Sequence, residues 1–280
     1  MNDHPFFLEA MMVSIRSARK LNRDIPIAAF IYSAGKDSLP KHVIPFLRRH
    51  NVRYILSPAM DDSWKTFLKW FALEHLAEYK RVLIVDADTV FFEDPHLLFK
   101  KYKKKDFWVR IEEFTDPKKT YRRFGNIDWP KQRALAHSLN ARELPIFGSG
   151  VMLFNKGFHR RVAEILPEFT RLHTLFLEKK LALPSSNFFI REEIVASLAM
   201  GQIGHFDYGI FNSEDYVWYN DWLKWKSSGL GIIMHVAAKL YLEFLHYHFH
   251  VPKPQKTRLW QNAPRKTRIP QGPPTLGKRR

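Results

Sequence analysis

Two aspartates, Asp86 and Asp88, directly follow a short apolar run and are the residues of this chain best suited to chemistry. The run, Val82–Val85, is rich in β-branched residues and too short for a helix, which is typical of a strand buried on both faces of a parallel sheet. Residues two apart on an extended backbone point to the same side, so the two carboxylates would lie about 7 Å apart. Ligands of open α/β sheets bind at the carboxyl ends of strands. The pattern predicts a site for a hard divalent cation, Mn²⁺ or Mg²⁺, which would in turn hold phosphate groups.

An Asp-x-Asp tripeptide also occurs in helix caps and turns. Here the sequence returns at once to apolar residues, Thr89–Phe92, which places the carboxylates inside the edge of the fold. A buried carboxylate without a partner is costly. A bound cation is therefore the interpretation that this setting favours.

The segment LIVDADTVFFEDPHLLF resembles the Asp-x-Asp segment of the GT-A-type nucleotide-sugar glycosyltransferases, in particular the glycogenin-like and galactosyltransferase-like retaining family. Weaker similarity extends over roughly residues 1–240. The resemblance implies a first strand that would precede the opening helix and hold the nucleotide base. The chain begins where that strand would already have ended, and Asn2 and Asp3 would be what remains of the base-contacting loop.

The resemblance also implies roles for three residues on the donor side. Lys69 would reach the donor diphosphate, although most lysines on helices are exposed to solvent and have no such role. The stretch Phe147–Asn155 is similar to the family's strand beside the donor sugar, and this implies that Ser149 and Gly150 line the site. Glycine also lets the backbone approach a ligand closely.

Acidic and basic residues between positions 192 and 250 complete the implied site. Glu192 and Glu193 stand where the family has an acidic residue facing the sugar; Glu193 is favoured, but acidic residues in a first helical turn are also ordinary partners of the helix dipole. His235 would be the third metal ligand and Lys239 would bind phosphate. Ala238 stands where the family has glycine, and His250 is an alternative ligand.

The order of the expected elements indicates an α/β fold. Apolar periodicity predicts a helix to about residue 21, a strand over Ile27–Tyr32, a helix over Leu39–His50 and a strand over Val52–Leu56. Further helices are expected leading up to Tyr79, over Lys131–Asn140 and over Phe158–Lys180. With the resemblance, this predicts a GT-A-like mixed, mostly parallel sheet flanked by helices and lacking the first nucleotide-binding strand.

Composition limits the partners. The formal net charge is +17, and residues 253–280 hold nine lysines and arginines and no acidic residue. We therefore expect a glycosyltransferase domain over residues 1–250 and a basic, proline-rich, disordered tail over 251–280. The tail could contact an anionic membrane peripherally, or have no fixed partner. The absence of cysteine fits a reducing, cytoplasmic compartment without proving one, and no run of apolar residues is long enough to span a membrane.

The predicted function is metal-dependent transfer of a hexose from a nucleoside-diphosphate sugar, most simply a UDP-sugar, to a saccharide or lipid-linked acceptor. Two alternatives remain open. The first is an inactive sugar-nucleotide-binding or scaffold protein, which would fit the missing strand. The second is a basic nucleic-acid-binding protein, which would explain the charge but not the two aspartates at a strand end. Nucleic acid is therefore disfavoured as a partner.

Overall fold

The structure, a computed structural model, describes residues 5–33, 39–57, 62–113, 127–185, 190–212, 215–218 and 233–235. The chain divides into two units, residues 1–241 and 242–280, and every described residue lies in the first. The predicted boundary after residue 250 stays a prediction. Among the described helices, none is both long enough and apolar enough to cross a membrane.

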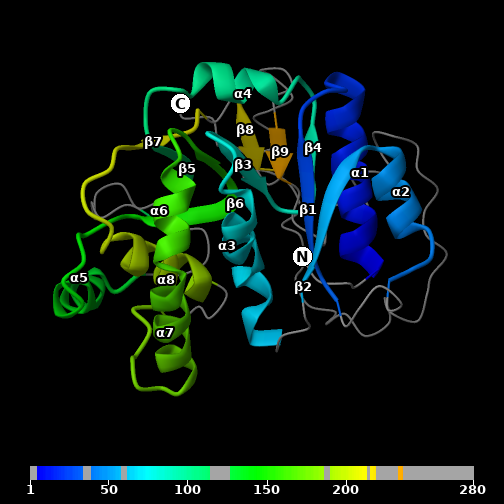
Figure 1. The fold of residues 1–280 in the computed structure, drawn as a ribbon. Coiled ribbons are helices and arrows are strands. Elements are labelled where there is room, and N and C mark those ends of the chain that lie inside the picture. The colour runs from blue at the N-terminus through cyan, green and yellow to red at the C-terminus, as the bar shows by residue number, and fades with distance from the viewer. Residues whose placement is uncertain are drawn as a thin grey trace, which may run out of the picture. The chain divides into compact units, whose positions relative to one another are not determined.

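The first part of the fold is a helix followed by a strand–helix–strand unit (Figure 1). Its elements are α1 (Pro5–Leu21), β1 (Ile27–Tyr32), α2 (Val43–Arg49) and β2 (Val52–Ser57). The two strands pair in parallel, with Ile27 opposite Val52 and Tyr32 opposite Ser57. The predicted bounds of β1 are confirmed, and α2 begins later than the predicted helix, beyond Pro40.

The middle of the chain delivers the two aspartates. Short helical segments come first, then strands and one more helix: η2 (Asp62–Phe67), α3 (Leu68–Phe71), η3 (Ala72–Leu76), β3 (Val82–Val85), β4 (Thr89–Phe91), α4 (His96–Lys101) and β5 (Phe107–Glu113). The bounds predicted for β3 are confirmed. The expected helix before it consists of one α-helical turn between two 3₁₀ segments, and 3₁₀ turns are common in short connecting helices.

The remaining strands complete a four-stranded and a three-stranded sheet, and the remaining helices pack around them. They are α5 (Trp129–Ser138), β6 (Ile146–Phe154), α6 (Phe158–Glu164), α7 (Leu166–Leu177), α8 (Arg191–Met200), β7 (Tyr208–Ile210), β8 (Tyr216–Trp218) and β9 (Ile233–His235). The single helix predicted over 158–180 is wrong, because the chain breaks at Ile165 and restarts with Pro167 in the first turn of α7. Proline has no N–H for an interior helical bond but fits a first turn.

The strands form three sheets with the orders β1-β2, β3-β6-β5-β7 and β4-β9-β8. Among the strands that the structure describes, three of the six pairings are parallel and three are antiparallel, since β6 runs against both β3 and β5, and β4 runs against β9. The fold is thus a mixed α/β arrangement flanked by helices, as predicted. The placement of Val82–Val85 in a parallel sheet is wrong, because β3 pairs antiparallel with β6.

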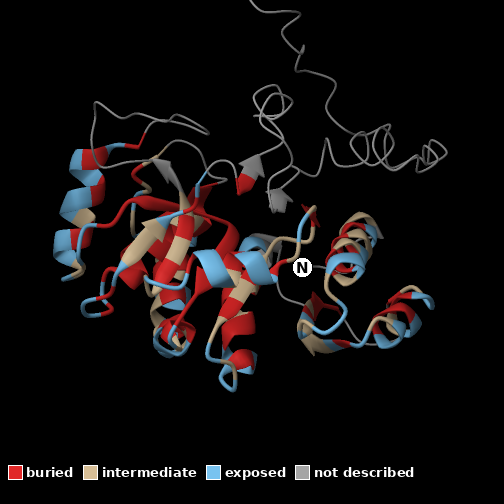
Figure 2. Cartoon of the chain, turned by 90° about the horizontal axis from the view of Figure 1, so that it is seen from above, coloured by how far each residue is buried: buried red, intermediate tan, exposed pale blue. Residues whose placement is uncertain are grey.

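The core is centred on β6, whose nine residues are all buried. This strand pairs with β3 on one side and β5 on the other, and helices such as α7 and α8 contribute buried apolar residues to the same cluster. Figure 2 shows helices that carry both buried and exposed residues, as expected for amphipathic helices packed on a sheet. The rigid β3–β6 pair is the part of the fold that positions the candidate site.

Candidate functional site

Asp86 and Asp88 lie where β3 ends. Residues 87 and 88 form a turn that carries the chain from β3, in the four-stranded sheet, to β4, in the three-stranded sheet. The expectation that both aspartates lie on one extended backbone is therefore wrong. The turn is held by the Thr89 hydroxyl, which donates to the Asp86 carbonyl at 2.9 Å and lies 3.1 Å from the Ser14 hydroxyl of α1. Asp88 is buried and Asp86 is partly exposed.

Lys69, on the single turn of α3, joins three separate segments at this point. Its Nζ lies 2.7 Å from Asp86 Oδ1 and donates to Ser149 Oγ at 3.0 Å. It also lies 3.8 Å from Glu192 Oε2. Burial disfavours the charged lysine, but the carboxylates of Asp86 and Glu192 outweigh it and raise the pKa of Lys69 above its ordinary value. Lys69 is therefore a fixed positive charge within the candidate site.

Glu192 is buried in the first turn of α8 and accepts two hydrogen bonds. Trp70 donates to it through Nε1 at 2.6 Å, and Ser149 donates through Oγ at 3.1 Å. Burial raises the pKa of Glu192 and the Asp86 charge adds to this, while Lys69 and the two donors oppose it. Only 4% of Glu192 is exposed, so its protonation is governed by these few neighbours.

Of the two predicted glutamates, the structure brings Glu192 into direct contact with the Lys69 network. Glu193 is only partly buried and acts on Lys69 through its charge. Sequence reasoning favoured Glu193 and did not single out Trp70. The contact between Trp70 and Glu192 joins residues 122 positions apart, and no local pattern signals such a contact.

Ser149 and Gly150 are presented to the site by an irregularity in β6. Val109 of β5 pairs with Met152, but the next residue, Arg110, pairs with Gly148, so three residues of β6 are passed over. On the other side the β3 pairing continues, and the Asp86 N–H donates to the Gly150 carbonyl at 2.9 Å. Bulges of this kind re-aim side chains next to functional sites. Here the bulge places the Ser149 hydroxyl between Lys69 and Glu192.

The backbone of His235 lies next to the aspartate turn. In the antiparallel pairing of β4 with β9, His235 is opposite Thr89, the residue that follows Asp88. The carboxylate oxygens of two aspartates fit a divalent cation such as Mn²⁺ or Mg²⁺ in donor chemistry, and histidine is the residue type predicted as the third ligand. Among the side chains that the structure describes, no group of three His, Asp or Glu is arranged around one metal position. Asn2, Asp3, Lys239 and His250 lie outside the described residues.

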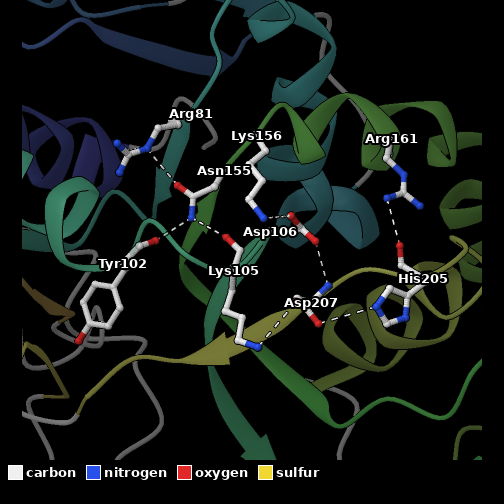
Figure 3. Close-up of polar contacts among 9 residues, drawn as sticks. All are labelled: Arg81, Tyr102, Lys105, Asp106, Asn155, Lys156, Arg161, His205 and Asp207. Atoms are coloured by element: carbon white, nitrogen blue, oxygen red, sulfur yellow. Dashed lines mark hydrogen bonds and ion pairs between the residues drawn. The ribbon is translucent and has the colours of Figure 1, made fainter.

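A second polar cluster lies at the opposite end of the β3–β6 pair, around Asn155 (Figure 3). The Asn155 amide donates to the carbonyls of Tyr102 and Lys105 at 2.7 and 2.8 Å and accepts from Arg81 Nε at 3.0 Å. Nearby, Lys156 pairs with Asp106 at 3.0 Å. The Asn155 contacts fix the turn between α4 and β5, so the cluster has a structural role.

Comparison with known proteins agrees with the fold. Residues 6–163 match the glycosyl transferase family 8, and this range contains Lys69, both aspartates and Ser149. The chain belongs to glycosyl transferase family 8. Family 8 membership confirms the resemblance to the GT-A-type nucleotide-sugar glycosyltransferases on which the sequence prediction rested.

Solved structures show the same GT-A fold at low sequence identity. The bifunctional glycosyltransferase WbbM aligns with a TM-score of 0.54 and 11% identity over 87% of this chain, which spans 48% of the length of WbbM. An active-site mutant of LgtC aligns with a TM-score of 0.52 and 12% identity over 93% of this chain and 97% of LgtC. No curated protein sequence matches the chain.

Proposed function

We propose that this family 8 protein transfers a hexose from a nucleoside-diphosphate sugar, a UDP-sugar in the first instance, to a saccharide or lipid-linked acceptor. The single observation that carries the proposal is the Lys69 network. It gathers Asp86, Ser149 and Glu192 from the end of β3, from β6 and from α8 around the partly buried ammonium group of Lys69. A glycosyl transferase needs positive charge where the diphosphate leaves and an acidic group near the sugar.

The chain's own residues would divide this work as follows. Lys69 would donate to the departing diphosphate from the position that it holds against Asp86 and Ser149. Glu192, or Glu193 beside it, would face the sugar ring, and the Ser149 hydroxyl would orient Glu192. Asn2 and Asp3 would contact the base and Lys239 the phosphate. The backbone of Gly150, which bonds to Asp86, would border the sugar.

A divalent cation, Mn²⁺ or Mg²⁺, would be held by Asp86 and Asp88 with His235 or His250. Bound there, it would supply Lewis-acid stabilisation of the negative charge that develops on the leaving diphosphate. The fit of this donor set rests on the aspartate turn and on the pairing of β4 with β9. We propose a cytoplasmic protein. If its basic tail binds an anionic membrane, the enzyme would encounter its acceptor at that membrane surface.

Calorimetric titration of UDP and of GDP, with and without Mn²⁺, tests the donor site. We expect Mn²⁺-dependent binding of UDP to the wild-type protein and its loss in Asp88→Ala. Asp207→Ala, an exposed carboxylate at the far end of the sheet, is the matched control and should bind as the wild type does. Binding of neither nucleotide to a folded sample would overturn the proposal.

Release of free hexose from UDP-glucose and UDP-galactose separates the proposed enzyme from an inactive sugar-nucleotide-binding protein. Slow, Mn²⁺-dependent hydrolysis that is lost in Lys69→Met would support transfer chemistry at this site. Tight binding of every donor without any turnover would favour the inactive alternative.

A further inference from the structure

The segment that leads from α4 to β5 is strongly basic, with five lysines among residues 100–105. The segment has two sides. Leu98 of α4 and Tyr102 just after it are buried and belong to one core cluster. The residues exposed on the other side are Leu97, Lys100, Lys101, Lys103 and Lys104.

Three of these cations lack a counter-charge. Two lysines of the segment pair with aspartates, but Lys100, Lys103 and Lys104 have no ion-pair partner among the residues that the structure describes. The turn that follows α4 is held by the Asn155 amide, which donates to two of its carbonyls. Exposed cations without counter-charges attract anionic partners, and here a fixed backbone presents them.

The carboxyl end of α1 adjoins α4 and adds to the same face. The side chain of Asn22 donates through Nδ2 to Asp94 Oδ1 at 2.8 Å, and Ala18 belongs to the same core cluster as Leu98. Figure 1 shows the end of α1 and helix α4 close together at the top of the view. The exposed residues at this end of α1 include Lys20, Leu21 and Arg23.

Apolar side chains are exposed on both segments. The described chain has four exposed large apolar residues, and two of them, Leu21 and Leu97, lie here, each 36% exposed. A single exposed leucine is ordinary on a protein surface. Asp24 and Glu93 are exposed acidic residues beside them, so the cations remain in excess. Exposed leucines among lysines, whose stems can pass beside apolar groups, are typical of surfaces that lie on lipid head groups.

We propose that the exposed residues of 20–23 and 97–104, which we call the α1–α4 face, dock on an anionic membrane surface. The two leucines would contact the acyl boundary and the cations the lipid phosphates. Each lysine or arginine near such a surface strengthens binding about fivefold.

The composition of the face favours lipid over nucleic acid. Binding of single-stranded nucleic acid uses exposed aromatic rings on which bases stack. Here Tyr102 is buried, and the Phe99 ring is covered by the guanidinium of Arg81 at 5.0 Å. Lysine also suits a lipid surface, because a point charge needs no fixed geometry toward the phosphate. The face is part of the folded unit and is separate in sequence from the basic residues 251–280.

A fluorescent label tests which face meets the membrane. The chain has no cysteine, so one engineered cysteine in the full chain can carry the environment-sensitive fluorophore NBD. Leu97→Cys places the label in the face, and Leu177→Cys, 38% exposed on α7, is the matched control. With vesicles of phosphatidylglycerol and phosphatidylcholine in equal parts, we expect emission from position 97 to rise about twofold or more and emission from position 177 to change little. Phosphatidylcholine vesicles should leave both unchanged.

Co-sedimentation of the unlabelled full chain with the same anionic vesicles tests the charges. Glutamine at Lys100, Lys103 and Lys104 together should weaken binding about 10²-fold, from about fivefold for each lysine. The matched control carries glutamine at three exposed lysines outside the face, Lys41, Lys131 and Lys179. Binding of this control should weaken by less than about fivefold, because screening confines the attraction to charges near the surface.

Four outcomes would overturn the proposal. Equal responses of the two labels would mean that the protein meets the vesicle through its tail or without a fixed orientation. Equal binding by the two triple variants would remove the lysines from the contact, and failure of the wild type to sediment with anionic vesicles would remove the membrane. A response of the label at position 97 to single-stranded DNA and not to vesicles would assign the face to nucleic acid. Vesicle binding requires no sugar nucleotide, so these results are independent of the donor titration.

Discussion

The two ends of the β3–β6 strand pair carry polar clusters that are built in opposite ways. At one end Asp86 and Glu192 share a single, partly buried lysine. The two carboxylates raise the pKa of Lys69 against the effect of its burial, and burial raises the pKa of Glu192. At the other end one buried amide, Asn155, makes three well-formed hydrogen bonds, two of them to backbone carbonyls. The same rigid strands support both clusters.

The contrast separates a functional cluster from a structural one. A buried amide with its partners satisfied fixes a loop at little electrostatic cost. Two carboxylates around one lysine are costly to desolvate, and such an arrangement persists where binding or catalysis uses it. The comparison therefore predicts that substitutions at the Lys69 end reduce activity most, whereas substitutions at the Asn155 end reduce stability.

The largest effect is expected for Lys69→Met, which removes the charge and keeps much of the side-chain length. Donor turnover should fall by about 10² to 10³-fold, the usual cost of losing one preorganised charged donor. Steady-state kcat/KM with a UDP-sugar measures this, and circular dichroism checks the fold. Lys131→Met, an exposed lysine of α5, is the matched control and should retain full activity. Activity within about twofold of wild type in Lys69→Met would remove Lys69 from the site and with it the contrast between the two ends.

Asn155→Ala should have the opposite effect to Lys69→Met and reduce stability while leaving activity largely unchanged. The side chain is 1% exposed, and its loss leaves two backbone carbonyls and Arg81 without these bonds. Each net bond contributes about 1 kcal/mol and a buried group left unsatisfied costs more, so the free energy of unfolding should fall by about 3 kcal/mol. Urea unfolding measures this, and kcat below the melting temperature should change by less than about twofold. A large loss of kcat in a folded sample would show that the two ends are coupled.

How far the sequence predicts the molecule depends on whether a feature is local. The apolar runs of β1 and β3 were assigned within their exact bounds because a strand signal is contained in four to six residues. Asp86 is predicted from the strand that precedes it, and Lys69 and Ser149 are implied by the family resemblance. The structure brings the three residues together.

Features that depend on distant partners were missed. The preference for Glu193 rested on a helix position and could not anticipate that Trp70 and Ser149 would bind Glu192. The aspartate turn was missed for a similar reason, because Thr89, which holds it, also contacts Ser14, a residue 75 positions away on α1. The break of the long helix at Ile165 could have been found from Pro167, since proline fits the first turn of a helix and not its interior.

A smaller effect, the pH dependence of stability that Glu192 causes, distinguishes the Lys69 end from the Asn155 end. Burial raises the pKa of Glu192 above the ordinary value that it has in the unfolded chain. The folded protein therefore holds this proton more tightly, so the contribution to stability is complete below the unfolded pKa and is lost as the pH rises through the folded pKa. Glutamine does not titrate, so the stability of the wild type relative to Glu192→Gln should fall as the pH rises above the ordinary pKa of glutamate. The fall is about 1.4 kcal/mol for each unit by which folding raises the pKa of Glu192.

Urea unfolding of both proteins at several pH values measures this difference. Glu193→Gln serves as the control, since Glu193 is only partly buried, and its difference from wild type should vary less with pH. A difference between wild type and Glu192→Gln that does not change with pH would mean that Lys69 and the two hydrogen-bond donors offset the burial of Glu192.

The smallest effect is expected for Lys156→Ala, at the Asn155 end. Lys156 lies 3.0 Å from Asp106, but more than half of its side chain is exposed. Exposed ion pairs contribute about 0 to 1 kcal/mol because water and salt screen them. Urea unfolding in low and in high salt should therefore show a loss of less than about 1 kcal/mol that disappears in high salt, with unchanged kcat. A loss of stability as large as that of Asn155→Ala would mean that the Lys156–Asp106 ion pair, and not the Asn155 amide, organises this end. The distinction between a functional cluster around Lys69 and a structural cluster around Asn155 would then fail.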